Sequence, residues 1–162
     1  MVVHGFTASE VLKLTGLTYR QLDYWASTDF IPPSNIEKVG LKTRRIYSFT
    51  DVLAIRAAMR LLDAGIPLQR IRKAVNRLQS ELPRKEALHS LVWLTDGENI
   101  FILESRDLAL DVIRGQYVFA FAVDVGQLAD KLEDDVRILE KRQRSRGTQR
   151  RYQCPEMAAT GM

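Results

Sequence analysis

The chain has 162 residues and a composition typical of globular proteins, enough for one domain with an appendage or for two small domains. No apolar run approaches the roughly 20 residues that a membrane-spanning helix needs, and the first residues lack the pattern of a signal peptide. The one cysteine, Cys154, excludes an internal disulfide framework and a metal site built from several thiolates of one chain. We therefore expect a cytoplasmic protein.

Charge is distributed unevenly along the chain. Residues 1–80 carry twelve Lys or Arg against six Asp or Glu, residues 81–136 five against twelve, and residues 137–162 seven against two. The basic start and end favour a polyanion such as nucleic acid as a partner, and the acidic middle indicates a different task. Solvated surfaces that differ by chance would give the same pattern, so the motifs must decide.

Two short helices joined by a tight turn are predicted near the start of the chain. Thr7 and Glu10 form a capping box that opens the first helix, and Gly16 suits the left-handed residue that ends it. Thr18 and Gln21 form a second box two residues later. This is the pattern of a helix-turn-helix unit, whose second helix enters the major groove of DNA by its N-terminal end.

A β-hairpin, or wing, is predicted for residues 34–47. Two consecutive prolines just before it end helical structure, because proline lacks an amide donor and fixes φ. The hairpin has a turn at Gly40, and its second arm carries Lys42, Arg44 and Arg45. Cations on a projecting hairpin are well placed to reach the phosphates that flank a groove.

Two longer helices are predicted after the wing. Ser48 is the expected cap of the third helix, whose apolar residues recur at helical spacing until Gly65. Pro67 suits the first turn of a fourth helix, which stops before Pro83. Residues 1–82 are therefore predicted to form a four-helix winged helix-turn-helix domain.

This N-terminal segment resembles the DNA-binding domain of the MerR family of bacterial transcriptional regulators. Five fragments carry the resemblance, in the family's order: Phe6–Val11, Thr15–Trp25, Phe30–Pro33, Arg45–Tyr47 with Ser48 and Asp51, and Leu62–Leu68. The resemblance implies that Arg20, Tyr24 and Arg45 hold DNA. Where family members often have a second basic residue, this chain has Asp23, which either points away from DNA or accepts a hydrogen bond from a cytosine amino group.

The second helix of the helix-turn-helix unit, called the recognition helix from here on, and the wing together supply nine predicted DNA contacts. They are Thr18, Tyr19, Arg20, Gln21, Tyr24, Lys42, Arg44, Arg45 and Tyr47. Structural interpretations stand beside this one: Arg20 as a solvated helix residue, Tyr24 packed against the wing, and Tyr47 as a structural residue.

Residues 88–123 are predicted to form a small α/β unit of order β-β-α-β, with a role that the sequence leaves open. Asp96-Gly97 is a strong hairpin signal between its first two strands. Its aromatic residues favour a core over a ligand cage. The expected elements are strands at 91–94 and 100–103, a helix at 105–113 and a strand at 117–123.

An amphipathic helix is predicted for residues 124–142. Its apolar stripe, which needs either the small sheet or another subunit as a partner, consists of Val125, Leu128, Leu132, Val136 and Leu139. MerR regulators pair through a long helix, so the resemblance implies a homodimer with this stripe as its interface. The basic segment 143–162 is predicted to be a flexible tail that either contacts phosphates or only aids solubility.

The sequence shows no catalytic, metal or cofactor site. His4 and His89 are isolated, and glycine-rich phosphate loops are missing. We therefore expect an α+β protein that is not an enzyme and needs no cofactor.

The predicted function is that of a cytoplasmic, nucleoid-associated transcriptional regulator that binds double-stranded DNA as a homodimer. The family corrects promoter spacing by distorting DNA, which adds RNA polymerase as a partner by resemblance; repression by occlusion is equally open. Two alternatives remain. One is an architectural protein of a mobile element, excisionase-like or partition-like. The other is a DNA-tethered adaptor whose acidic C-terminal unit binds a protein.

Overall fold

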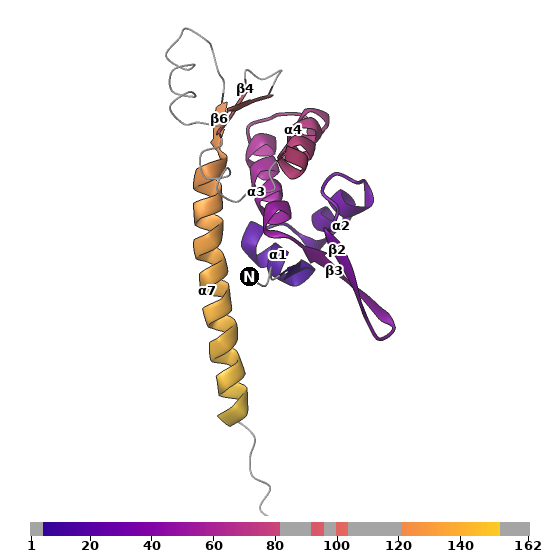
Figure 1. Cartoon of the computed structure of the whole chain (residues 1–162), viewed down its shortest axis with the longest axis vertical. Helices are drawn as coiled ribbons and strands as arrows, with labels where there is room; N and C mark the ends of the chain where they lie inside the picture. The colour runs from indigo at the N-terminus through magenta and orange to yellow at the C-terminus, as the bar shows by residue number, and fades with distance from the viewer. Residues whose placement is uncertain (1–4, 82–91, 96–99, 104–120, 153–162) are drawn as a thin grey trace, which may run out of the picture.

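A computed structural model of the protein describes residues 5–81, 92–95, 100–103 and 121–152. Within them, four helices pack around a common core, a β-hairpin projects from one side, and a long helix runs along the other side (Figure 1). The architecture is α+β, as predicted. Among the helices of these segments, none combines the length and the apolar composition needed to cross a membrane.

The first four helices begin and end close to the predicted signals. Their bounds are α1 Ala8–Thr15, α2 Tyr19–Ser27, α3 Phe49–Asp63 and α4 Leu68–Glu81. Both predicted capping boxes and the cap at Ser48 are present. Gly16 has φ of 78°, a left-handed conformation that favours glycine and ends α1. These boundaries are local, which is why neighbouring residues predict them.

The wing belongs to a three-stranded antiparallel sheet in the order β1-β3-β2. The hairpin itself is β2, Asn35–Val39, with β3, Lys42–Tyr47, as predicted. The third strand, β1 (Phe6–Thr7), was not predicted, because two residues are too short to show an alternating pattern. It pairs with the base of β3 directly before α1, so the wing is held beside the first helix.

A second sheet contains β4, Val92–Thr95, β5, Ile100–Leu103, and β6, Phe121–Asp124, in the order β5-β4-β6. The predicted pairing of the first two strands is confirmed, whereas the Asp96-Gly97 turn and the helix expected at 105–113 lie outside the described residues. The central strand is buried, and its Trp93 belongs to the same core as α1 to α4. This sheet and the N-terminal helices therefore share one hydrophobic core.

The long helix α7 spans Val125–Tyr152, ten residues beyond its predicted end at 142. Its far part extends past the rest of the described chain (Figure 1). The prediction that the flexible tail begins at residue 143 is therefore wrong for residues 143–152. Disorder was inferred from low apolar content, but this segment is rich in Arg and Gln, which have high helix propensity.

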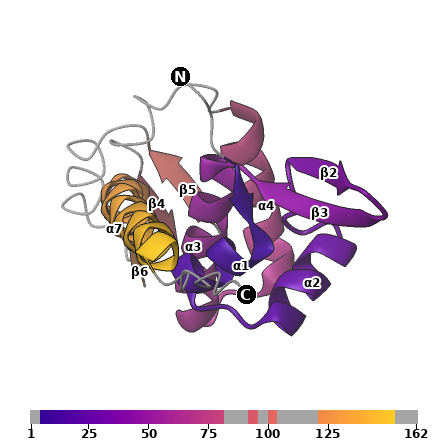
Figure 2. The same cartoon turned by 90° about the horizontal axis from the view of Figure 1, so that it is seen from below.

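The apolar stripe of α7 packs within its own chain. Val125 and Leu132 are fully buried and Leu128 is 8% exposed, while Val136 and Leu139 pack against the same core. Figure 2 shows α7 beside the N-terminal helices, and it contacts α3, α1 and β4. The stripe therefore has a partner within its own chain, and its part in pairing two subunits stays a prediction.

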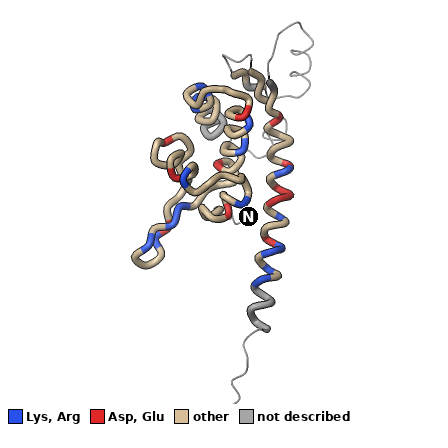
Figure 3. Tube along the Cα trace, turned by 180° about the vertical axis from the view of Figure 1, so that it is seen from behind, with Lys and Arg blue, Asp and Glu red and all other residues tan. Residues whose placement is uncertain are grey.

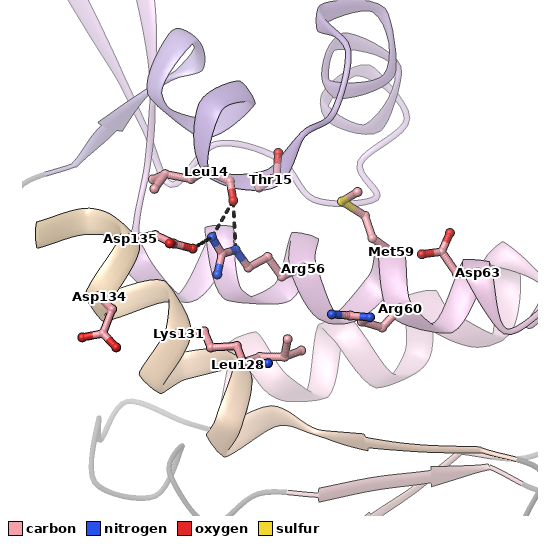
Figure 4. Close-up of a pocket in the computed structure, with 10 residues that line it drawn as sticks. All are labelled: Leu14, Thr15, Arg56, Met59, Arg60, Asp63, Leu128, Lys131, Asp134 and Asp135. Carbon is pink, nitrogen blue, oxygen red and sulfur yellow. Dashed lines mark hydrogen bonds and ion pairs between the residues drawn. The ribbon is translucent and has the colours of Figure 1, made fainter. Parts of the chain in front are cut away.

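Arg56 joins three helices where α7 meets the N-terminal domain. Its Nε and Nη2 atoms donate hydrogen bonds of 3.0 and 2.6 Å to the carbonyl oxygen of Leu14, at the end of α1. The same guanidinium forms an ion pair with Asp135 of α7 (Figure 4). Beside it lies an open cleft of about 570 Å³, lined by α1, α3 and α7. Arg56 therefore fixes α7 against the turn that precedes α2.

Candidate nucleic-acid interface

The recognition helix α2 is anchored by one face and exposes the other. Leu22 and Trp25 are 1% and 6% exposed and hold the helix on the core, as predicted. Tyr19 and Tyr24 are 63% and 56% exposed, and Arg20 is exposed as well. Large aromatic and cationic side chains on the open face of a short helix suit contacts with base edges and phosphates.

Thr18 and Gln21 are exposed at the start of α2, and their side chains bond to each other across the capping box. The backbone nitrogen of Thr18 donates to Oε1 of Gln21 at 3.0 Å, and the backbone nitrogen of Gln21 donates to Oγ1 of Thr18 at 3.3 Å. Both oxygens are thus engaged in fixing the helix start. These two predicted contacts share one structural task, which is to present the N-terminal end of α2.

The wing carries cations along both arms. Lys42 and Arg44 are exposed on β3, and Lys38 is exposed on β2. Glu37 lies opposite Arg44 in the strand register and is the one acidic residue in the two strands. Figure 3 shows Lys and Arg spread along the hairpin. The predicted wing cations are therefore placed on a projecting, positively charged element.

Tyr47 departs from its predicted role. Its side chain is fully buried in the core, at the end of β3 opposite Phe6 of β1. Burial raises the pKa of the Tyr47 phenol above its ordinary value, and the nearby charge of Arg45 opposes this rise. The prediction that Tyr47 contacts DNA is therefore wrong. Tyr47 packs in the core, as the alternative structural interpretation had it.

The recognition helix and the wing enclose an open cleft of about 520 Å³. Tyr19 and Asp23 line it from α2, and Lys42, Arg44 and Arg45 line it from β3. Across it, Nη1 of Arg45 lies 2.7 Å from Oδ1 of Asp23, and the two side chains are 38% and 48% exposed. The hydrogen bond to Asp23 is the main reason that the pKa of Arg45 lies above its ordinary value.

The pair between Asp23 and Arg45 was missed by the sequence analysis. The sequence did hold a signal for this pair, because Asp23 stands where the family often has a cation. Its partner Arg45 lies 22 positions away in another element. The two readings weighed for Asp23, pointing away or reading cytosine, did not include a bond to the wing. In the structure, Asp23 faces the wing and connects it to α2.

The segment with two short capped helices, a cationic hairpin and two longer helices is similar in sequence to a known protein family. Residues 6–78 match the family described as MerR HTH family regulatory protein. These residues are a MerR-family helix-turn-helix domain. The MerR domain so defined ends within α4 and contains the whole cleft between α2 and the wing.

Similarity to curated proteins extends beyond the MerR domain. Three relatives, each described as an uncharacterized HTH-type transcriptional regulator, come from Mycobacterium bovis and from two strains of Mycobacterium tuberculosis. Each is 37% identical over 120 residues, which cover 74% of this chain and 52% of the relative. The chain spans about half the length of these relatives. Because the aligned stretch is longer than the MerR domain, part of the C-terminal half is also similar.

Proposed function

We propose that the chain is a DNA-binding transcriptional regulator of the MerR type that acts on double-stranded DNA as a homodimer. The observation that carries this proposal is the cleft between the exposed face of α2 and the cationic wing. An exposed helix with a charged hairpin beside it matches a duplex, whose groove accepts the helix and whose phosphates flank the groove. The MerR-family match and the names of the relatives support the same function.

In the proposed complex, the N-terminal end of α2 enters the major groove. Arg20 and Tyr19 lie there and are the side chains that we expect to meet base edges. Lys42 and Arg44 of the wing are expected to contact phosphates, which supply affinity that is independent of sequence and sensitive to salt. Wing and helix thus divide the work between holding the duplex and reading it.

Two copies are part of the proposal because one short helix reads too few base pairs for a specific site. The stripe predicted for pairing is covered in the single chain, so two copies must either meet through other surfaces or exchange α7. An exchange would preserve the contacts of α7 with α3 and α1 while making them between chains. The effect of a Leu132 substitution on the dissociation constant of the dimer, considered in the Discussion, distinguishes these arrangements.

The proposed function can be tested in two steps. The purified protein selects duplexes from a random library, which are sequenced, and footprinting then examines the matching sites of the genome. Regulation predicts a single two-fold symmetric footprint at a promoter. An extended array of bound sites would instead favour the architectural role. Absence of salt-dependent binding to any duplex at low ionic strength would refute both.

Replacing Arg45 by alanine should weaken binding to all duplexes alike. Loss of one phosphate contact lowers the slope of log affinity against log salt by about one. Fluorescence anisotropy with a labelled duplex at several salt concentrations measures both quantities. Arg60→Ala is the matched control, because Arg60 is exposed beside α7 rather than at the wing. Unchanged affinity and slope would remove Arg45 from the interface.

Replacing Arg20 by alanine should cost about 1–3 kcal/mol on the selected site if the side chain reads a base. The library selection repeated with this variant should show a relaxed preference at one position of each half-site. An affinity loss that is equal on selected and random duplexes would instead identify Arg20 as a phosphate contact.

A further inference from the structure

Asp23 places a negative charge inside the surface that the proposed function turns toward a polyanion. It lies on α2 among the side chains that line the cleft with the wing, and its carboxylate is 48% exposed. A carboxylate near phosphates is unfavourable unless a donor neutralises it. In the free protein that donor is Arg45, at 2.7 Å. DNA binding must therefore resolve a competition between Asp23 and phosphate for Arg45.

We propose that Asp23 is a specificity-determining residue of this interface, which rejects duplexes that offer it no hydrogen-bond donor. On an arbitrary sequence, a phosphate that draws Arg45 away leaves Asp23 facing DNA without its partner. On the preferred sequence, the amino group of a cytosine in the major groove replaces the lost donor. The inference rests on the proposed function, because it assigns a role within the same DNA-binding surface.

Discrimination of this kind works through a penalty on the wrong partner rather than a stronger grip on the right one. Interfaces gain specificity when an unpaired charge opposes the incorrect ligand. Aspartate suits this task because an ionised carboxylate only accepts hydrogen bonds, so neither a phosphate nor a base acceptor satisfies it. Cytosine is the base whose exposed major-groove edge offers a donor without a neighbouring acceptor of its own.

A purely mechanical role for Asp23, as a brace between α2 and the wing, predicts a different result. If the ion pair only sets the angle of the hairpin, weakening it loosens the interface and lowers affinity for every duplex. If Asp23 enforces selectivity, removing its charge relieves the penalty and raises affinity for arbitrary duplexes. The two roles therefore differ in the sign of the change on random DNA.

Asp23→Asn separates these roles because asparagine keeps an acceptor oxygen for Arg45 and loses the charge. The full chain, wild type and variant, is titrated into the duplex selected by the wild type and into a scrambled duplex of equal length. Asp63→Asn is the control for net charge, because it removes the same charge at a site away from the wing. Asp63 is exposed at the cleft between α1, α3 and α7. Repeating the library selection with Asp23→Asn reports which base preference changes.

We expect Asp23→Asn to bind the scrambled duplex more tightly and the selected duplex about equally, so that the ratio of the two affinities falls about fivefold or more. The selection should lose a preference for cytosine at one position of each half-site. Equal changes on both duplexes, a loss of affinity on both, or an unaltered base preference would overturn the inference. If the wild type itself selects no sequence, the proposed function fails first, which is a separate result.

Discussion

Replacing Phe30 by alanine should lower the free energy of unfolding by about 3–5 kcal/mol, the range for large aromatic residues deleted from a core. Phe30 is fully buried directly after α2. Its ring lies 4.9 Å from that of Trp25 in an edge-on arrangement, and the guanidinium of Arg72 lies 5.7 Å above it. The ring therefore connects the recognition helix to α4.

Urea denaturation followed by circular dichroism measures this change. Leu41→Ala is the matched control, because Leu41 lies fully exposed at the tip of the wing and its loss should change stability by less than about 0.5 kcal/mol. Arg72, which lies over the Phe30 ring, also donates to the carbonyl of Thr28 at the end of α2. Loss of the ring should loosen this anchor of the recognition helix, so we expect weaker DNA binding by the Phe30 variant even where it is folded. A stability loss under about 1 kcal/mol would contradict the packing described for Phe30.

Replacing Leu132 by alanine should cost about 2–5 kcal/mol, because its side chain is fully buried between α7 and the N-terminal helices. If α7 packs on its own chain, the variant should lower the stability of each subunit and leave the dissociation constant of the dimer, measured by sedimentation, unchanged. Ile138→Ala on the same helix is the control, because Ile138 is 48% exposed and should tolerate truncation.

The same measurement tests how two copies associate. Pairing through any surface makes the midpoint rise with protein concentration. A Leu132 variant whose dimer dissociates more readily than that of the wild type would therefore indicate that α7 is exchanged between chains. A dissociation constant equal to that of the wild type would assign pairing to other surfaces. A Leu132 variant as stable as the wild type would contradict the burial of α7 altogether.

Local signals predicted the helix boundaries well. Thr7, Thr18 and Ser48 each act on backbone groups within three residues. The residues that determine where each helix begins are therefore adjacent in the sequence. The wing was predictable for the same reason, since its turn and its alternating arms are contiguous. For these elements, the sequence pattern and the structure describe the same short-range physics.

Partners that lie far apart in the chain were not predictable from one sequence. The amphipathic pattern of α7 revealed an apolar face but not what covers it, because a stripe packs equally well on its own domain or on another subunit. Asp23 with Arg45, and Arg56 with Asp135, are separated by 22 and 79 positions. Tyr47 was misassigned because its motif implied contact, whereas the β1–β3 pairing places it inside.

The core that α7 and the second sheet complete has a practical consequence for dissecting this protein. Trp93, Val123 and Leu132 all lie C-terminal to the predicted helix-turn-helix unit and yet are buried together with its residues. A fragment that ends at residue 82 would expose an apolar surface of α1 and α3 to water, and such a surface promotes self-association. Poor behaviour of such a fragment would reflect the missing cover rather than any defect in its grip on DNA.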